Sequence, residues 1–117
     1  MTSLAVRLRA LAMVLLAACA SQQPPDDAEI AALQPLKRQY VGLIAGFDVR
    51  PHNTLIVSVD LQQYIESDDN TIAAMKRDTL RRWREAWIAE HPRAHAVLRV
   101  RFIDFIGRKV ATETTRA

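Results

Sequence analysis

The chain of 117 residues contains a single cysteine, Cys19, and only three glycines. One cysteine excludes an intrachain disulfide, so the folded core must depend on side-chain packing. The glycines form no phosphate-binding loop, and no serine lies in a nucleophile-elbow motif. The uncharged apolar stretch at residues 10–18 is too short to cross a bilayer, because a transmembrane helix needs about 20 residues. The sequence therefore offers neither a recognisable catalytic nucleophile nor a transmembrane helix.

The charge of the chain gives no reason to expect nucleic acid as a partner. There are 16 basic and 13 acidic residues, which gives a formal net charge of +3. Two of the arginines, Arg7 and Arg9, precede the apolar stretch at residues 10–18. Without them the charges almost balance, whereas a nucleic-acid-binding surface generally needs a marked excess of basic residues. We therefore expect no nucleic acid partner.

Metal ligands are also sparse. His91 and His95 are four residues apart, but Pro92 ends any helix between them, so the two rings need not share a face. Residues 68–70 lack the glycine and the distal glutamate of a calcium loop, and helix capping explains these residues better. We expect no metal, no cofactor and no catalytic residue.

The first residues of the chain have the features of a secretory signal. A positively charged segment is followed by the apolar stretch at residues 10–18 and by small residues directly before the cysteine. The motif Leu16-Ala17-Ala18-Cys19 resembles the lipobox of bacterial lipoproteins. This resemblance implies that residues 1–18 are a signal peptide, that cleavage occurs before Cys19, and that its sulfur carries diacylglycerol.

The same resemblance implies a location in the cell. Lipid on Cys19 would anchor the protein to a membrane, since two or more acyl chains anchor a protein stably. The next residue is Ala20, not the aspartate that retains many such lipoproteins in the inner membrane. The implied location is periplasm-facing, with the outer membrane favoured over the inner membrane. The alternative is an ordinary secretory signal and a soluble periplasmic protein.

The remainder of the chain divides into a tether and one domain. Residues 19–27 are polar, contain proline and lack periodicity, which is typical of a flexible tether. Residues 28–117 are enough for one domain, and they show no internal repeat. Residues 28–34 favour a helix that Pro35 ends or kinks.

Alternation of apolar and polar residues predicts two β-hairpins. The first pairs strands at residues 41–49 and 54–61, and the second pairs strands at residues 95–105 and 109–115. Between the hairpins an amphipathic helix is predicted over residues 71–90. The predicted fold class is α+β: a small single domain ordered hairpin, helix, hairpin, with a four-stranded, mainly antiparallel sheet and the long helix on one face.

Two faces of the predicted long helix suggest binding. Trp83 and Trp87 lie on its apolar face, where a carbohydrate-binding platform is one interpretation and burial against the sheet is the favoured one. On the opposite side Arg77, Arg81 and Arg84 form a basic strip. Such a strip is suited to an anionic surface beside a membrane, and the alternative is a solvated face balanced by neighbouring acids.

The sheet face away from the long helix is the predicted partner-binding surface. The alternation assigns to it the apolar side chains of Ile44, Ile56, Ile103 and Phe105. Several exposed apolar side chains on a small domain indicate an interface. The alternative is that residues 28–40 fold over this face and bury them.

These features together predict a membrane-anchored, non-catalytic lipoprotein of the cell envelope. It would act as a protein-interaction or accessory module of an envelope assembly. The alternative function is that of a periplasmic ligand-binding or envelope-modifying domain with a cleft near His91, His95 and Trp87.

Overall fold

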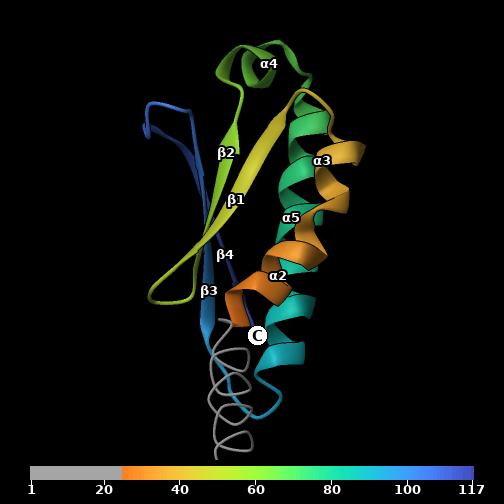
Figure 1. Cartoon of the computed structure of the whole chain (residues 1–117). Helices are drawn as coiled ribbons and strands as arrows, with labels where there is room; N and C mark the ends of the chain where they lie inside the picture. The colour runs from red at the N-terminus through yellow and green to blue at the C-terminus, as the bar shows by residue number, and fades with distance from the viewer. Residues whose placement is uncertain (1–24) are drawn as a thin grey trace, which may run out of the picture.

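The computed structural model describes residues 25–117, so the predicted signal peptide and Cys19 lie outside the described residues. Within this part of the chain the helices gather on one side of a single sheet (Figure 1). None of these helices is long and apolar enough to cross a membrane. The elements follow in the order α2 (Pro25–Leu33), α3 (Pro35–Gln39), β1 (Ile44–Arg50), β2 (Thr54–Val59), α4 (Leu61–Glu66), α5 (Asp69–Glu90), β3 (Val97–Ile103) and β4 (Lys109–Arg116).

The sheet confirms the predicted fold class. Its strand order is β1-β2-β3-β4, with antiparallel pairing of β1 with β2 and of β3 with β4. The two hairpins meet through β2 and β3, which run parallel. Parallel neighbours need a crossover connection, and α4 and α5 supply it here. The long helix therefore lies across one face because it links two parallel strands.

The core lies between α5 and the sheet face that this helix covers. The alternate residues of β2 and β3 that point to this face are fully buried, and so is Trp83. Trp87 is 4% exposed, so burial of both tryptophans against the sheet is confirmed. Burying a large apolar side chain contributes about 1.5–3 kcal/mol, so this layer dominates the stability of the domain. The inward residues of the two central strands are Leu55, Val57, Val59, Leu98, Val100 and Phe102.

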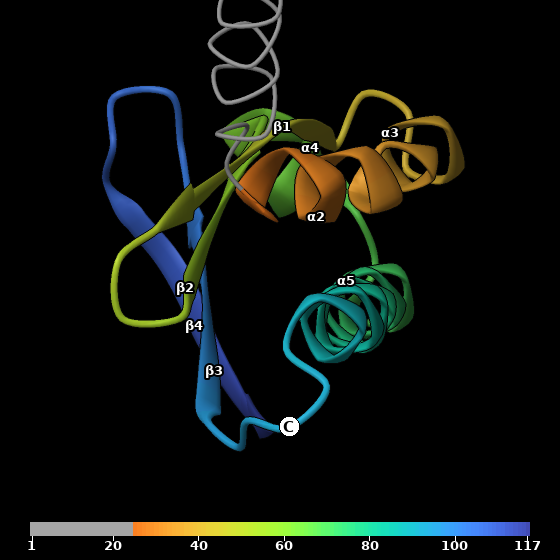
Figure 2. The ribbon, with the colours of Figure 1, turned by 60° about the horizontal axis from the view of Figure 1, so that its bottom comes forward.

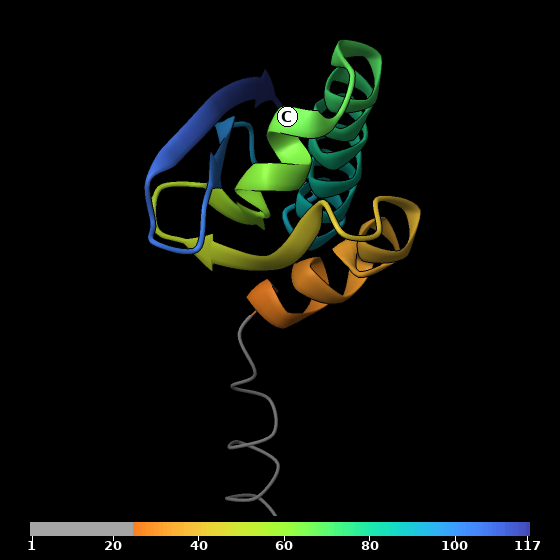
Figure 3. The same ribbon diagram turned by 90° about the horizontal axis from the view of Figure 1, so that it is seen from above.

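The two N-terminal helices pack beside α5, on the same side of the sheet (Figures 2 and 3). Leu33 of α2 and Leu36 of α3 are fully buried in the same core as the inward residues of β2. Helix α2 ends at Leu33, close to the predicted end at Pro35, and Pro35 itself begins α3, a helix that the sequence did not predict. The alternative in which residues 28–40 cover the opposite sheet face is therefore wrong, and no other element among residues 25–117 covers that face.

Strand β1 departs from simple alternation at Ala45. The pairing register shifts between Ile44, which pairs with Val59, and Gly46, which pairs with Ser58. A bulge of this kind inserts one residue and reverses the side to which the preceding residues point. Ile44 is therefore 5% exposed and belongs to the core, next to Leu43. Its predicted place on the outward face was wrong.

Helix capping fixes the two helices between β2 and β3. The Asp60 side chain accepts a hydrogen bond from the Gln63 amide at 2.9 Å and starts α4, so β2 ends at Val59 and the predicted strand at residues 54–61 was two residues too long. The Asp68 side chain accepts from the Thr71 amide at 2.6 Å and starts α5, which confirms the predicted capping role for Asp68, while Asp69 and Asn70 form the first residues of the helix. Each aspartate satisfies an amide that the first helical turn leaves without a backbone partner.

Candidate functional site

The turn between β3 and β4 presents two large apolar side chains to solvent. Phe105 is 79% exposed and the adjacent Ile106 is 74% exposed. In Figure 1 this turn lies at the end of the sheet that also bears α4. Two adjacent, strongly exposed apolar side chains make this turn a candidate interaction site.

A buried carboxylate holds this turn in one conformation. Asp104, which is 4% exposed, accepts hydrogen bonds from the amides of Ile106 at 3.0 Å and Arg108 at 2.9 Å. Its second oxygen accepts from the Arg108 Nε at 2.8 Å. These donors, the Arg108 amide foremost, lower the pKa of Asp104. Gly107 has a φ of 90°, a backbone conformation that side-chain-bearing residues rarely adopt. The exposed pair is thus presented by a fixed turn.

The outward sheet face carries two of the four residues of the predicted partner surface, but it is largely polar. Ile56 and Ile103 are half-buried on this face. Ile56 lies between Asp48 and Arg101 in the strand register, and Asp48 forms an ion pair with Arg50 at 2.8 Å. Of the four predicted residues, only Phe105 is strongly exposed. Among residues 25–117, Val41, Ile65 and Val97 are also exposed, but Phe105 and Ile106 are the two exposed large apolar side chains that are adjacent in the chain.

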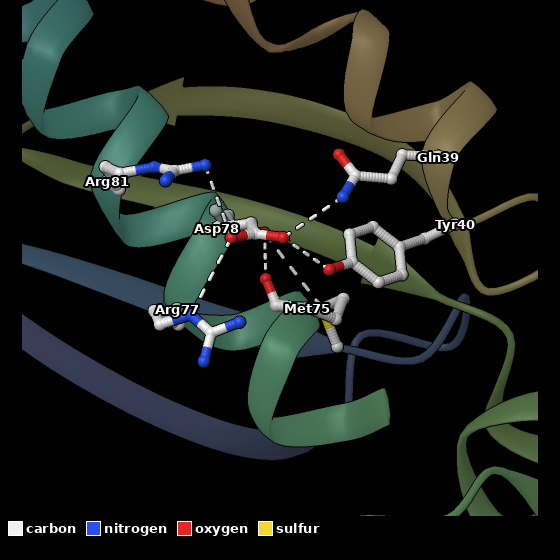
Figure 4. A network of polar contacts seen from close by, with 7 residues as sticks. Gln39, Tyr40, Met75, Arg77, Asp78 and Arg81 are labelled. Atoms are coloured by element: carbon white, nitrogen blue, oxygen red, sulfur yellow. Dashed lines mark hydrogen bonds and ion pairs between the residues drawn. The ribbon is translucent and has the colours of Figure 1, made fainter. Parts of the chain in front are cut away.

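A polar network joins α5 to the end of α3 (Figure 4). The buried Asp78 carboxylate accepts hydrogen bonds from the Tyr40 hydroxyl at 2.5 Å and the Gln39 amide nitrogen at 3.2 Å. On its other oxygen it lies 3.4 Å from Arg81 Nη2 and 3.8 Å from Arg77 Nε. The closest partner of Asp78 is thus Tyr40, which lies 38 positions earlier in the chain.

The electrostatics of this network favour a charged aspartate and a neutral tyrosine. The hydrogen bond from Tyr40, helped by Arg81 and Arg77, lowers the pKa of Asp78 against the opposing effect of burial. Burial, with the hydrogen bond to Asp78, raises the pKa of Tyr40 to about 12. A neutral phenol that donates to a carboxylate is a stable pair over the physiological pH range. We assign this network to the attachment of α3 on α5.

The predicted basic strip lines a groove between α4, α5 and β4. Arg77 and Arg81 are 72% and 61% exposed, and the Arg84 Nε donates to the Arg116 carbonyl at 2.7 Å. The groove has a volume of about 950 Å³, and Arg77, Arg81 and Arg84 all line it. Ile72 and Leu80 of α5 contribute apolar surface to the same groove. The three arginines are thus brought together, but beside an apolar floor.

The structure contains a cleft at Trp87 and His91, two of the three residues that the alternative function places together. A cleft of about 270 Å³ is lined by Trp87, His91 and the buried Glu29, among others. The rings of Trp87 and His91 stack with centroids 4.3 Å apart, and His91 Nδ1 lies 3.9 Å from a Glu29 oxygen. His95 lies outside this cleft, with its Nδ1 3.4 Å from the Ala117 carbonyl. In residues 25–117 no three histidine, cysteine or carboxylate side chains gather as a metal site.

Comparison with known proteins adds no functional assignment. No protein-family model matches this chain, and neither the curated proteins nor the solved structures contain a significant match. The functional inferences below therefore rest on the residues and geometry of this chain.

Proposed function

We propose that this protein is a lipoprotein of the cell envelope that docks a protein partner through Phe105 and Ile106. Lipid on Cys19 would anchor it to a membrane on the periplasmic side, with the outer membrane favoured. Its role in this proposal is non-catalytic, that of an interaction module in an envelope assembly. The observation that carries the proposal is the fixed β3–β4 turn, which exposes two large apolar side chains.

Burial of Phe105 and Ile106 by a partner would stabilise the complex. Exposed Phe105 and Ile106 gain nothing from the folded core, and about 1.5–3 kcal/mol each becomes available when a partner buries them. Because Asp104 already fixes the turn, docking loses little conformational entropy. A small, rigid apolar anchor of this kind is typical of the residues that dominate binding energy at protein interfaces.

The position of the turn suits a protein held at a membrane. Pro25, where α2 begins, is six residues beyond Cys19, a spacing that reaches at most about 20 Å. Figure 1 shows the start of α2 towards the end of the molecule that bears the β1–β2 turn. The β3–β4 turn lies at the other end. An anchor at Cys19 would therefore leave Phe105 and Ile106 facing away from the bilayer.

The double variant Phe105→Ala/Ile106→Ala tests the docking function. We expect chemical crosslinking in membranes to capture a partner with the wild-type lipoprotein, and the yield to fall by at least about tenfold in the variant. The free energy of unfolding should stay within about 0.5 kcal/mol of the wild type, since both side chains are solvent-exposed. The matched control is Val97→Ala, which removes an apolar side chain that is 56% exposed on the outward sheet face. Equal capture by the double variant and the wild type would contradict the proposal.

A second candidate function, binding of a small ligand, is supported by the cleft at Trp87 and His91. Both tryptophans are buried, so a flat carbohydrate platform is not available, and the cleft of about 270 Å³ admits only a small molecule. A thermal-shift screen of small polar metabolites tests this function. A compound that raises the Tm of the wild type but not of His91→Ala supports it, and the absence of any such compound counts against it.

A further inference from the structure

We propose that an extended, acidic segment of a partner protein binds in the groove between α5 and β4 and adds a strand to the open edge of β4. This site is separate from the β3–β4 turn, so it goes beyond the docking function proposed above. The proposal rests on two independent features: the unpaired backbone of β4 and the composition of the groove beside it.

Strand β4 is an edge strand with backbone groups free for pairing. It pairs with β3 on one side, and no strand among residues 25–117 pairs with its other side. The Ala117 amide donates to the Ala96 carbonyl at 3.0 Å. In an antiparallel ladder this bond places the amide and carbonyl groups of Thr112, Thr114 and Arg116 on the side away from β3. An edge of this kind accepts another strand by main-chain hydrogen bonds.

The Arg116 carbonyl on this edge already accepts a hydrogen bond, which limits where an added strand can pair. The Arg84 Nε donates to the Arg116 carbonyl at 2.7 Å and covers the C-terminal end of the edge. Thr112 and Thr114 are exposed. The added strand would therefore pair along the part of β4 that contains these two threonines.

The groove specifies the side chains of the added strand. Residues that a strand beside β4 points towards α5 would meet the apolar surface of Ile72 and Leu80. Basic groups surround this floor: Lys76, Arg77, Arg81 and Arg84 line the groove, against the acidic Asp69 and Glu113.

Pairing within the protein leaves a positive rim. Lys76 lies 3.6 Å from Glu113, so these two charges compensate each other. Asp78 offsets part of the charge of Arg77 and Arg81, whose side chains remain 72% and 61% exposed. The rim therefore favours a segment that alternates apolar and acidic residues.

The same charges argue against a second copy of this chain as the occupant. Two β4 strands paired edge to edge would bring two sets of Lys109 and Arg116 to one interface, each beside the Arg84 of its own copy. Like charges placed together at an interface are destabilising, and they oppose this association. A phospholipid surface would match the basic rim but would not use the amides of Thr112 and Thr114.

A peptide titration tests the proposal directly. The probe is a capped, fluorescent peptide of alternating valine and aspartate, long enough to pair along β4, added to the full-length protein in detergent. We expect saturable binding that weakens as the ionic strength rises, because salt screens the charges of the rim. The matched peptide of alternating valine and lysine should bind at least about tenfold more weakly. A fully N-methylated valine–aspartate peptide, which donates no backbone hydrogen bond, should show the same loss.

Two variants locate the site on the protein. Thr114→Pro removes an amide that points to the open edge, so it should abolish peptide binding and leave the sheet bonds in place. Thr114→Val keeps that amide and is the matched control. Equal binding of the N-methylated peptide, or unchanged affinity in Thr114→Pro, would overturn the proposal. It would also be overturned if phosphatidylglycerol vesicles bound through Arg77 and Arg81 while the valine–aspartate peptide did not bind.

Discussion

Replacing Asp78 with alanine is expected to lower the free energy of unfolding by about 3 kcal/mol. The variant leaves the Tyr40 hydroxyl and the Gln39 amide without the acceptor that both use in the folded protein. It also removes the polar attachment of α3 to α5, and the buried Leu36 then holds α3 by apolar packing alone. Urea denaturation followed by circular dichroism measures the change.

Two further variants separate this network from general effects on the helix. Tyr40→Phe removes only the hydroxyl that donates to Asp78 at 2.5 Å, so it should cost about 2 kcal/mol. Glu85→Gln changes an exposed carboxylate on the same helix, and it should stay within about 0.5 kcal/mol of the wild type. If Asp78→Ala were as stable as Glu85→Gln, the network would not hold α3 on α5.

The hydrogen bond between Tyr40 and Asp78 predicts how the free energy of unfolding changes at alkaline pH. The pKa of Tyr40 is about 12 in the folded protein, against about 10 in an unfolded chain. The folded state therefore holds this proton more tightly, and the stability it contributes is lost as pH rises from about 10 to about 12. Tyr40→Phe should lack this component. Asp78 has a lowered pKa, so its contribution is present above the ordinary carboxyl pKa and is lost as acidification reaches the folded value.

Replacing Asp104 with alanine is expected to weaken partner capture by at least about tenfold, although Asp104 is itself buried at the base of the turn. The alanine side chain cannot accept from the amides of Ile106 and Arg108. Phe105 and Ile106 would then be presented by a mobile turn, and docking would have to order it. The yield of crosslinked partner in membranes, divided by the wild-type yield, measures this loss.

Asparagine at the same position provides the matched control. The amide oxygen of Asp104→Asn can accept from the same two backbone amides, as in an Asx turn, whereas the charge opposite Arg108 and the hydrogen bond from the Arg108 Nε are lost. We therefore expect Asp104→Asn to retain most of the capture. If Asp104→Ala and Asp104→Asn captured the partner equally well, the fixed shape of the turn would not matter for docking.

Local patterns were sufficient to predict most of the fold. The apolar stripe that contains Trp83 and Trp87 identified α5, and period-two alternation identified both hairpins. Pro35 marked the boundary between α2 and α3. These features depend on residues close together in the chain, so the sequence alone carries them.

The errors arose where distant residues decide the structure. Ile44 was placed on the outward face because a bulge at Ala45 cannot be recognised from alternation alone. The partner of Asp78 is Tyr40, which a helix pattern cannot reveal because α3 reaches it only through the tertiary fold. His91 lines a cleft with Glu29, whereas His95 lies elsewhere, since the chain turns between them.

One missed residue did leave a local signal. Asp104 is followed by Gly107 three positions later, and this spacing is typical of a tight turn whose first residue caps the amides that follow. That pattern would have drawn attention to Ile106 beside Phe105, which the alternation of residues had already singled out. The arginines of the basic strip were identified from helical spacing, but the groove beside them depends on where β4 lies.

The mass of the protein isolated from its membrane tests the lipoprotein assignment most directly. The account predicts a chain that begins at Cys19 and carries a diacylglyceryl group on its sulfur, with further acylation of the new amino group. Tryptic digestion should then yield a lipidated peptide that runs from Cys19 to Lys37, because no lysine or arginine lies between them. A free thiol at Cys19, or an uncleaved leader, would contradict the account.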